Sequence, residues 1–336
     1  MNMLILAGDI GGTNTRLLLS DGEDTIRAEK NYLSCEYTGL INVLKSFISE
    51  FNIALEFDAV CMAVAGPVKS GQASITNLPW VISESELSHF LKTENVSLIN
   101  DFIAVSYGIS RLSEADFLVI QQTEYNTQNQ DAAVIGAGTG LGASHLIYRH
   151  GEYLACPSEA GHAAFAPENE LQTQLLTSLQ KSNHHVSLEN ILSGRGLLII
   201  YEFLRLTNGI LESNEVRQAM QDEDPARVIT EYALLESDQL CEKTLDIFVE
   251  IYASAAGNIA LHYYPVGSVY LAGGIAIKIK DKLNSQRFID AFINKGLMSE
   301  NMKQLSIKLI LDDRVGLQGA VKYASINSGV YQGVNQ

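Results

Sequence analysis

A loop rich in glycine and threonine occurs twice in this chain, each time between two apolar runs. The first copy reads LILAGDIGGTNTRLLL over residues 4–19, and the second reads AAVIGAGTGLGASHLI over residues 132–147. Thr13 and Thr139 hold equivalent places in the two copies. A hairpin tip built from Gly and Thr leaves backbone N–H groups uncovered, and such groups bind anionic oxygens well. Two such tips, one in each half of the chain, predict two lobes that close on one polyphosphate, as in a nucleotide-dependent phosphotransferase or ATPase.

Two carboxylates stand where apolar strands are predicted to end. Asp9 closes the first apolar run directly before the first loop, and Asp101 follows the predicted strand Val96–Ile99. Open α/β sheets bind their ligands at the carboxyl ends of strands, so both carboxylates are candidates for phosphoryl-transfer chemistry. The alternative is structural, because Asp often caps a turn or a helix. From the residues alone, a helix N-cap is as good an interpretation of Asp101 as catalysis.

The elements around these groups predict two α/β halves. In the first half, apolar residues with a 3.6-residue period predict a helix near residues 38–52, and Ala59–Ala65 reads as a buried strand. Ser83 and Glu86 have the spacing of a capping box, which predicts the start of a short helix. A further helix is expected to run to about Arg111.

The second half repeats the order of strand, Gly loop and strand, and is then mostly helical over residues 168–264. Its longest helix is expected to end before Pro265, because proline cannot continue a helix. A last apolar strand, Ser268–Ala272, leads into Gly273-Gly274. This order of elements predicts an α/β fold.

Two other nucleotide-binding motifs can be compared with the sequence. No GxxxxGK[ST] string occurs, which excludes a P-loop enzyme. Residues 138–143 read GTGLGA and satisfy the loose dinucleotide-binding pattern, but that pattern requires a helix next. The chain continues as HLIYRHGEYL, which reads as strand, turn at His150-Gly151 and strand. A Rossmann fold is therefore the weaker interpretation.

Composition indicates a globular enzyme and disfavours several kinds of partner. The 336 residues suffice for two domains or one large one, and 46% of them are apolar and 18% charged. A net charge of −16 without any basic run argues against nucleic acid or an anionic membrane as partner. A phosphate site in such a chain must rely on backbone N–H groups and a divalent cation more than on basic side chains.

Cysteine usage and the N-terminal segment favour a reducing cytosol. The cysteines lie far apart and form no Cys-x-x-Cys pair, so neither a structural zinc site nor a disulfide framework is expected. They are Cys35, Cys61, Cys156 and Cys241. The N-terminus is apolar only to Ala7 and no basic region precedes it, so no signal peptide is expected. No apolar run is expected to be long enough to cross a bilayer.

The motifs, in this order and spacing, resemble those of the bacterial glucokinases of the actin-like ATPase (sugar kinase) superfamily. The resemblance runs from about Leu4 to about Gly319. Five segments carry it: DIGGTNTRL at 9–17, AGPV with TNLPW within 65–80, INDF at 99–102, GAGTGLG at 136–142 and SEAGH at 158–162. LSGRGL at 192–197 and AGGIA at 272–276 add support. The repressor-like sugar kinases share the first loop, but their cysteine-rich zinc motif is missing here, which disfavours that branch.

The resemblance implies a two-lobed actin-like ATPase (ribonuclease H-like) fold, with a small and a large α/β domain around a central cleft that binds glucose. The small domain would comprise residues 1–110 plus about 305–336, and the large domain residues 111–304. The implied activity is that of an ATP-dependent glucokinase, a hexokinase-type phosphotransferase with an alcohol acceptor. Such an enzyme moves the γ-phosphoryl of Mg-ATP to the 6-hydroxyl of glucose, which gives glucose 6-phosphate and ADP at the entry to glycolysis.

Partners and location follow from the same resemblance. Glucose and ATP with Mg²⁺ are the implied small molecules, in the cytoplasm and without nucleic acid or membrane. The family is commonly homodimeric, although no residue shows it.

The resemblance also assigns roles to individual residues. Asp101 is implied as the general base, and Asp9 as the carboxylate that holds the water shell of Mg²⁺. The implied glucose contacts are Asn100, Asp101, Glu159, His162 and Glu189. The implied ATP contacts are Gly8, Asp9, Ile10, Gly11, Gly12, Thr13, Asn14, Gly138, Thr139, Gly273 and Gly274. Asn77 within TNLPW is expected to shape the sugar pocket.

Alternatives remain open for some residues and for the function. Glu159-x-x-His162 could be half of a di-iron motif, and Glu189 could simply lie in the first turn of a helix. SEAGH stands where the family more often has GEGGH, a difference that could shift preference among hexoses. The competing functions are a kinase for mannose or fructose, a non-catalytic sugar-binding regulator, and an actin-like ATPase without a sugar substrate.

Overall fold

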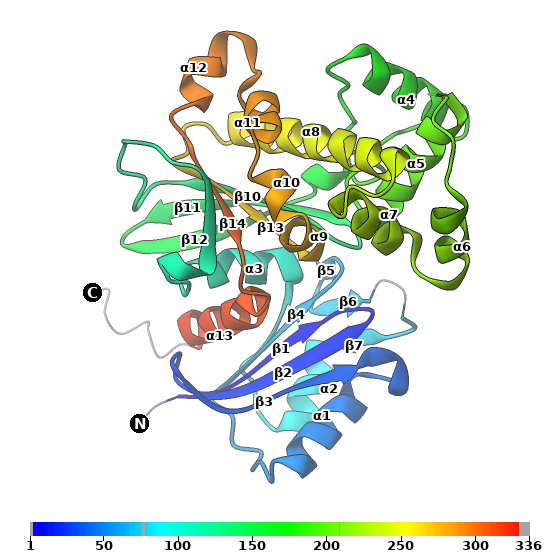
Figure 1. The fold of residues 1–336 in the computed structure, drawn as a ribbon. Helices are drawn as coiled ribbons and strands as arrows, with labels where there is room; N and C mark the ends of the chain where they lie inside the picture. Colours follow the sequence, from blue (N-terminus) through cyan, green and yellow to red (C-terminus); the bar gives the residue numbers. More distant parts are fainter. Residues whose placement is uncertain (1–2, 76–77, 208, 329–336) are drawn as a thin grey trace. The chain divides into compact units, whose positions relative to one another are not determined.

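The computed structural model describes residues 3–75, 78–207 and 209–328 of the chain (Figure 1). Asn77, expected at the sugar pocket, lies outside the described residues. The chain divides into two compact units. The first unit comprises Met1–Ser113, Tyr153–Pro157 and Asp312–Gln336, and the second comprises Glu114–Glu152 and Ser158–Leu311.

The first unit is built on a five-stranded sheet in the order β3-β2-β1-β4-β8. Its first three strands form an antiparallel meander, whereas β4 and β8 follow β1 in parallel. These strands are β1 Leu4–Ile10, β2 Asn14–Asp21, β3 Thr25–Leu33, β4 Ala59–Val64 and β8 Val96–Asn100. Every residue of β4 is buried, which confirms the strand predicted from its continuous apolar run.

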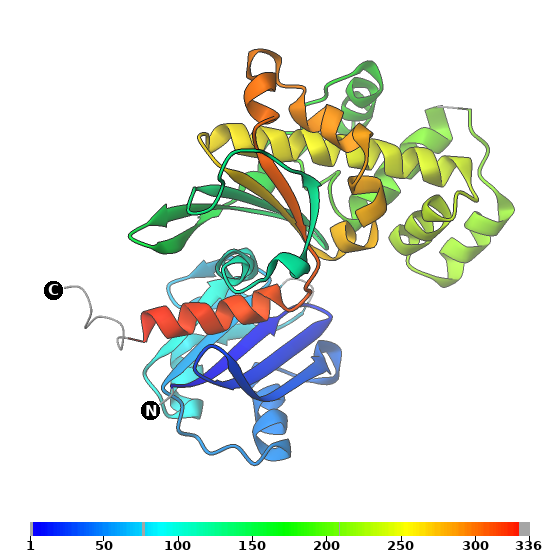
Figure 2. The ribbon, with the colours of Figure 1, turned by 60° about the vertical axis from the view of Figure 1, so that its left-hand side comes forward.

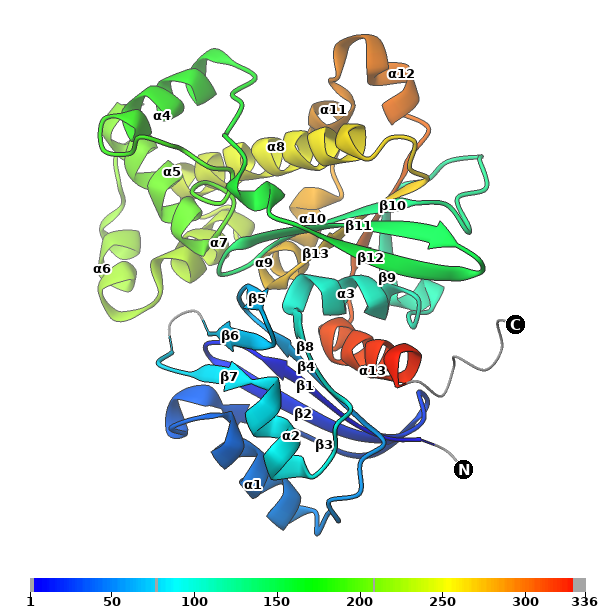
Figure 3. The same cartoon turned by 180° about the vertical axis from the view of Figure 1, so that it is seen from behind.

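Helices cover both faces of this sheet (Figures 2 and 3). On one face, Leu6 and Ile10 belong to a core shared with α1 (Leu40–Glu50) and α2 (Glu84–Leu91). On the other face, the alternate residue Ala7 belongs to a second core, shared with α3 and α13. These two helices span Asp101–Ile109 and Val315–Asn327. The period of two along β1 therefore directs its side chains into two separate cores.

Helices α3 and α13 pack with their backbones unusually close together. A Cβ atom on Gly319 would lie 1.7 Å from the carbonyl oxygen of Ala104, and one on Gly108 would lie 2.0 Å from that of Val315. No side chain fits at either position, so both glycines are required by the close approach of the helices.

The second unit repeats the strand pattern of the first. Its six-stranded sheet has the order β12-β11-β10-β13-β14-β9, in which β10 and β11 are antiparallel and β13 and β14 follow β10 in parallel. The predicted repeat of strand, Gly loop and strand, followed by a turn and another strand, is confirmed. The strands are β9 Phe117–Gln121, β10 Ala132–Ala137, β11 Leu141–Arg149, β12 Glu152–Ser158, β13 Ser268–Ala272 and β14 Ser306–Ile310.

The remaining elements are mostly the helices of the second unit. They are α4 Glu170–Gln180, α5 Gly194–Thr207, α6 Asn214–Asp222, α7 Pro225–Leu234, α8 Gln239–His262, α9 Gly274–Lys278, α10 Lys280–Leu283, α11 Gln286–Ile293 and α12 Ser299–Met302. Short 3-10 turns lie at η1 Ser34–Glu36, η2 Glu114–Asp116, η3 Ala160–His162 and η4 Gly296–Met298. The first unit also has a small sheet of β5 Val68–Lys69, β6 Gln72–Ser74 and β7 Val81–Ser83.

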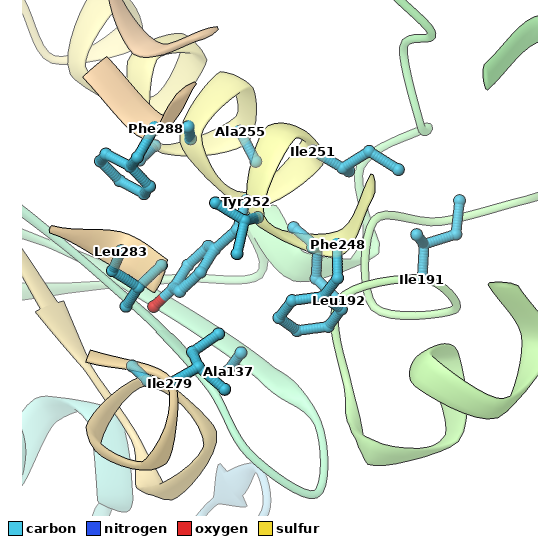
Figure 4. Close-up of a cluster of buried hydrophobic side chains, with 14 of the residues drawn as sticks. Ala137, Ile191, Leu192, Phe248, Ile251, Tyr252, Ala255, Ile279, Leu283 and Phe288 are labelled. Carbon is cyan, nitrogen blue, oxygen red and sulfur yellow. The ribbon is translucent and has the colours of Figure 1, made fainter. Parts of the chain in front are cut away.

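Helix α8 carries the centre of the core of the second unit (Figure 4). Its Tyr252 is fully buried among apolar side chains that include Phe248 and Phe288. The Tyr252 hydroxyl lies 3.2 Å from the carbonyl oxygen of Ile135 in β10 and 3.3 Å from that of Ala272 in β13. One buried hydroxyl therefore ties α8 to both parallel strands that lead into the Gly motifs.

By length and composition α8 could cross a membrane, contrary to the expectation that no run is long enough. The apolar window of the helix is 78% buried inside the second unit. Its apolarity is therefore explained by the core that it forms, because a helix that is apolar on most sides can be satisfied by packing alone.

Three sequence expectations need correction. Ser83 does not cap α2 with its side chain, because its hydroxyl bonds to that of Ser85 at 2.8 Å. Ser268–Ala272 is not the last strand, since β14 follows it and pairs with β13. Lys308 interrupts the apolar run of β14, so this strand did not stand out in the sequence. Because β14 completes the second sheet, the return to the first unit begins at Asp312 rather than at about residue 305.

We expect Tyr252→Phe to lower the free energy of unfolding by about 1–2 kcal/mol, because it removes the buried hydroxyl that both strand carbonyls accept from. Urea unfolding followed by circular dichroism measures the change. Tyr125→Phe is the control, since Tyr125 is 63% exposed and its loss should change stability by less than about 0.5 kcal/mol. Equal stability of Tyr252→Phe and the wild type would show that the hydroxyl does not hold the strands.

Candidate functional site

The first Gly loop connects β1 to β2. The backbone N–H of Gly11 donates to the carbonyl oxygen of Asn14 at 2.8 Å and so closes the turn, while the Ser34 hydroxyl donates to the carbonyl oxygen of Gly11. The backbone N–H groups of Gly12 and Thr13 have no acceptor among the described residues, and Thr13 is exposed. Two consecutive amides and one hydroxyl are therefore available to an anion.

The second Gly loop, between β10 and β11, is also closed by one backbone hydrogen bond. The backbone N–H of Gly138 donates to the carbonyl oxygen of Gly140 at 2.8 Å. Within the part of the chain that the structure describes, the N–H groups of Thr139 and Gly140 find no acceptor, and Thr139 is exposed. Both loops thus leave two consecutive amides without an acceptor among the described residues, although the closing hydrogen bond spans three residues in the first loop and two in the second.

Two residues predicted to contact ATP lie below the first loop. Gly8 is in the middle of β1, where a Cβ atom would lie 2.4 Å from Sδ of Met62, and Ile10 is fully buried in the core. The side of the strand that they occupy faces α1 and α2, so neither offers a side chain to a ligand. Asn14 begins β2, and its side-chain oxygen accepts from Asn31 at 3.1 Å.

Gly273 and Gly274 follow β13, the parallel neighbour of β10. Gly273 has a φ of 95°, and a Cβ atom on it would lie 2.3 Å from the carbonyl oxygen of Ala137, so only glycine fits there. Gly274 begins α9 and has open space around its missing side chain. The structure therefore brings these two predicted ATP contacts next to the second loop, at the carboxyl ends of two parallel strands.

Glu189 holds the second loop against another predicted segment. One oxygen of its carboxylate, Oε2, accepts a hydrogen bond from the backbone N–H of Leu141 at 3.0 Å. The backbone N–H of Glu189 donates to the carbonyl oxygen of Gly161 at 2.9 Å. A Cβ atom on Gly140 would lie 2.5 Å from Oε2, so glycine leaves room for the carboxylate. Glu189 lies in a turn that precedes α5, and the interpretation that it sits in the first turn of a helix is wrong.

Glu159 and His162 flank the 3-10 turn η3. Nε2 of His162 lies 3.8 Å from Oε2 of Glu159, and the two side chains are 62% and 78% exposed. Gly161 between them is required, because a Cβ atom would lie 2.0 Å from the carbonyl oxygen of Leu141. The segment is not an α-helix, so the pair does not form the helical Glu-x-x-His of a di-iron site. The second unit thus joins Glu159, His162 and Glu189 around one loop.

Asn100 and Asp101 lie in the first unit, at the end of β8. The side-chain oxygen of Asn100 accepts from the backbone N–H of Phe102 at 2.9 Å, so Asn100 is the N-cap of α3. Oδ1 of Asp101 lies at the same distance from that N–H group. The interpretation of Asp101 as the N-cap is therefore wrong, since its neighbour has that role.

The sheet places Asp9 near Asp101. Asp9 is in register with Ala63 of β4, and Ala63 is in register with Ile99 of β8. The strands that carry the two carboxylates are thus two positions apart in the sheet, or about 10 Å from axis to axis. Asp101 follows Ile99 by two residues, directly after β8, so it lies at the same end of the sheet as Asp9.

Burial, first, and the negative charge of Asp9, second, raise the pKa of Asp101 from its ordinary 3.8, and hydrogen bonds such as that from the N–H of Phe102 lower it, so that the net value is about 7. Each cause acts on the charged form, which burial and a second carboxylate destabilise and which a hydrogen-bond donor stabilises. A carboxylate with a pKa close to neutrality exchanges protons readily at physiological pH. Asp101 is therefore suited to general-base chemistry.

Asp9 is a partly buried carboxylate without a hydrogen-bond donor among the residues that the structure describes. Burial raises its pKa, the charge of Arg16 across the β1–β2 pair lowers it, and Asp313 raises it. Arg16 is held by Asp313, through the carbonyl oxygen at 2.8 Å and the carboxylate at 2.6 Å. Gly316 leaves space in front of Asp9, since even a Cβ atom would stay 3.6 Å from Oδ2. A carboxylate with open space and no protein donor fits the hydrated Mg²⁺ predicted there.

The sequence analysis missed Asp313 and Gly316 as neighbours of Asp9. A signal for them exists in the repeat, because Asp312-Asp313 follows β14 as Asp101 follows β8. Recognising it requires β14 to be identified as a strand, which Lys308 within its apolar run obscured.

Comparison with known proteins gives one consistent result. A family model described as Glucokinase matches residues 6–327. A glucokinase of Trichormus variabilis is 39% identical over 339 residues, which cover 96% of this chain and 99% of that protein. The crystal structure of a glucokinase from an Antarctic psychrotroph is similar with a TM-score of 0.82 and 32% identity, and covers 96% of this chain and 99% of that one. A ROK-family glucokinase from Streptomyces griseus, solved in complex with glucose and AMPPNP, shares the fold at 18% identity, with a TM-score of 0.61 over 96% of this chain and 99% of that one.

The raised pKa of Asp101 predicts that Asp101→Asn stabilises the protein at pH 8. The folded state holds the Asp101 proton up to about pH 7, whereas the unfolded chain loses it near pH 4, so stability falls as the pH rises between these values. Asn carries no charge, so the variant does not lose this stability. The loss for the wild type is about 4 kcal/mol of unfolding free energy, because the pKa differs by about three units between the folded and unfolded states.

Urea unfolding at pH 4 and at pH 8 measures this effect. The free energy of unfolding of Asp101→Asn should exceed that of the wild type by a large amount at pH 8, and the difference should vanish towards pH 4. Asp281→Asn is the control, because Asp281 is exposed and its neutralisation should change stability by less than about 0.5 kcal/mol at either pH. A gain of Asp101→Asn that is the same at both pH values would contradict the raised pKa.

Proposed function

Because the chain belongs to the glucokinase family, we propose that its Asp101 is the general base for transfer of the γ-phosphoryl of ATP to the 6-hydroxyl of glucose. The predicted family is confirmed, as are the two-lobed actin-like ATPase fold and the class of hexokinase-type phosphotransferase. One observation supports the role of Asp101 most strongly. Its carboxylate stands at the carboxyl end of β8, beside Asp9, with a pKa raised to about 7.

The reaction asks little covalent work of the protein. The deprotonated carboxylate of Asp101 accepts the proton of the sugar 6-hydroxyl as that oxygen forms its bond to the γ-phosphorus. The bond from the γ-phosphorus to the bridging oxygen breaks, and ADP leaves with the electron pair. Asp101 then releases the proton to water. A pKa near 7 suits both the uptake and the release of this proton.

We propose that the unpaired amides of the two Gly loops bind the phosphate oxygens of ATP. Gly12 and Thr13 supply them from the first unit, and Thr139 and Gly140 supply them from the second. Backbone donors suit a chain with a net charge of −16 and no basic run, because they attract phosphate without requiring lysine or arginine. Gly273 and Gly274, beside the second loop, are the proposed adenosine contacts.

Asp9 is the proposed holder of the water shell of Mg²⁺. When bound, Mg²⁺ supplies positive charge that neutralises the phosphate oxygens of ATP. Asp9 itself lies within electrostatic reach of Asp101 and raises the pKa of that carboxyl. The charge of Asp9 thus has a second effect, since it makes Asp101 a stronger base.

The sugar contacts that we propose are Asn100 and Asp101 from the first unit and Glu159, His162 and Glu189 from the second. The second set is exposed or partly buried and is held together by the contacts of Glu189 with Leu141 and Gly161. Since Oε2 of Glu189 is bonded to the loop, its Oε1 oxygen is the one left to accept from a sugar hydroxyl. Carboxylates, amides and imidazole together provide the forked donors and acceptors that hexose hydroxyls require.

We also propose that the enzyme works on soluble glucose and Mg-ATP in the cytoplasm, without a nucleic-acid or membrane partner. The net charge of −16 supports this, because both of those surfaces are anionic. A homodimer stays a prediction from the family.

We expect Asp101→Ala to lower kcat by about 10²–10⁴-fold, because the reacting hydroxyl loses its base. A coupled assay for ADP release with Mg-ATP measures this with glucose, mannose, fructose, N-acetylglucosamine and no sugar. The wild type should turn over with glucose and not without sugar.

Three outcomes would change the proposal in different ways. Turnover only with mannose or fructose would leave the proposed mechanism unchanged but would show that the substrate is another hexose. ATP hydrolysis that ignores sugar would favour an actin-like ATPase. Retention of more than a tenth of the wild-type kcat by Asp101→Ala would remove Asp101 from the role of base.

The pH dependence of kcat/KM for glucose provides a further test. This parameter reports the pKa of the essential base in the unliganded enzyme. Since Asp101 must be deprotonated to act, the wild-type value should rise about tenfold for each pH unit below about 7 and level off above it. The residual activity of Asp101→Asn should lack that rise. A wild-type profile that is flat from pH 5 to pH 8 would contradict the raised pKa.

A further inference from the structure

Arg195 lies in the first turn of α5, the helix whose first residue contacts the second Gly loop. It is the second residue of α5, directly after Gly194, whose backbone N–H donates to the carbonyl oxygen of Gly138 at 3.1 Å. The Ser193 hydroxyl accepts from the backbone N–H of Gly196 at 3.1 Å and closes the first turn of the helix. These contacts fix the backbone of Arg195 beside the loop whose amides are unpaired.

Arg195 stands apart from the other arginines of the chain. Each of the others has a carboxylate within 4.0 Å. Arg195 is exposed and has no such partner in residues 3–75, 78–207 and 209–328. The chain has 39 acidic and 23 basic residues, so the guanidinium of Arg195 is left unpaired among the described residues although carboxylates outnumber basic side chains.

Stability does not explain the residue. A positive charge in the first turn of a helix is disfavoured by the helix dipole, and the first turn of α5 has no acidic residue to offset it. The neighbouring Gly196 has its own structural reason, since a Cβ atom would lie 1.9 Å from the carbonyl oxygen of Ile191. No such packing constraint applies to Arg195, because its side chain is exposed. A bound anion would neutralise the positive charge of Arg195, which no acidic side chain within the first turn of α5 offsets.

We propose that Arg195 binds a phosphate group of the nucleotide, together with the unpaired N–H groups of Thr139 and Gly140. The inference rests on the proposed function, in which the second loop holds the phosphates of ATP. The planar guanidinium donates two parallel hydrogen bonds to a phosphate, which complements single backbone donors. A neutral sugar offers no comparable partner, so the residue serves nucleotide rather than glucose binding.

The test compares Arg195→Gln with Arg205→Gln. Arg205 lies on the same helix, is exposed and pairs with Glu202 three residues earlier, so the control makes the same change in net charge away from the loop. Calorimetric titration measures the Kd of Mg-AMPPNP, ADP, AMP and adenosine, and of glucose, for both variants and the wild type. Arg195→Lys is a third variant, because it keeps the charge and loses the fork.

Arg195→Gln should weaken binding of Mg-AMPPNP by about 10–100-fold, the range expected when a hydrogen bond between charged groups is lost. Adenosine and glucose should bind as to the wild type, and Arg195→Lys should fall between. The step in the series AMP, ADP, AMPPNP at which the variant first loses affinity identifies the phosphate. The melting temperature should not fall, since the substitution removes a charge that the helix dipole disfavours.

Two results would overturn the inference. One is a Kd for Mg-AMPPNP within twofold of the wild type in Arg195→Gln. The other is an equal loss of affinity for adenosine or a lower melting temperature, either of which would show a structural role. Failure of the proposed function is distinguishable, because the wild type itself would then bind no nucleotide in the same titration.

Discussion

Within each unit, the geometry of the Gly loop depends on the pairing of the two strands that flank it, which ends directly at the loop. Gly11 and Gly138 close their turns with one backbone hydrogen bond each, and the strands on either side are paired up to the loop. The two amides at each tip are thereby held in place and left without acceptors. Preorganised donors of this kind bind charge without reorganisation during the reaction, which is how backbone groups stabilise phosphoryl transfer most effectively. Two helices of the second unit support its tip: α8 through Tyr252, which bonds to Ile135 in β10, and the α5 segment through Gly194, which bonds to Gly138.

The carboxylates show a conflict between stability and chemistry. Asp9 and Asp101 are close enough in the first sheet that the charge of one raises the pKa of the other, and burial acts in the same direction. A fold selected only for stability would separate or neutralise such a pair. Their proximity is therefore a cost that the fold bears for function, and it is partly offset by Arg16, which Asp313 holds beside Asp9. Stability given up at a reacting group is a common property of enzyme sites.

Glu189 shows how one side chain can serve two purposes. Its Oε2 oxygen holds the nucleotide loop through Leu141, its backbone holds Gly161, and its second oxygen is left for a ligand. Two glycines accommodate this segment by leaving out a side chain: Gly140 beside the carboxylate and Gly161 against Leu141. Gly273 is required for the same reason elsewhere, against the carbonyl oxygen of Ala137. The glycines of the motifs are thus explained by close approach as much as by turn conformation.

Features that depend on neighbours along the chain could be predicted from the amino-acid sequence. The repeated Gly loops, the buried β4, the long α8 and the motifs of the family were all readable, because periodicity, turn residues and motif spacing are local properties. Tertiary structure alone decided the pKa of Asp101, the bond from Glu189 to Leu141, the cap by Asn100 in place of Asp101, and the pairing of the short β14. Most of these depend on groups brought together by folding from distant parts of the chain. The desolvation and hydrogen bonds that result have no counterpart in the order of residues.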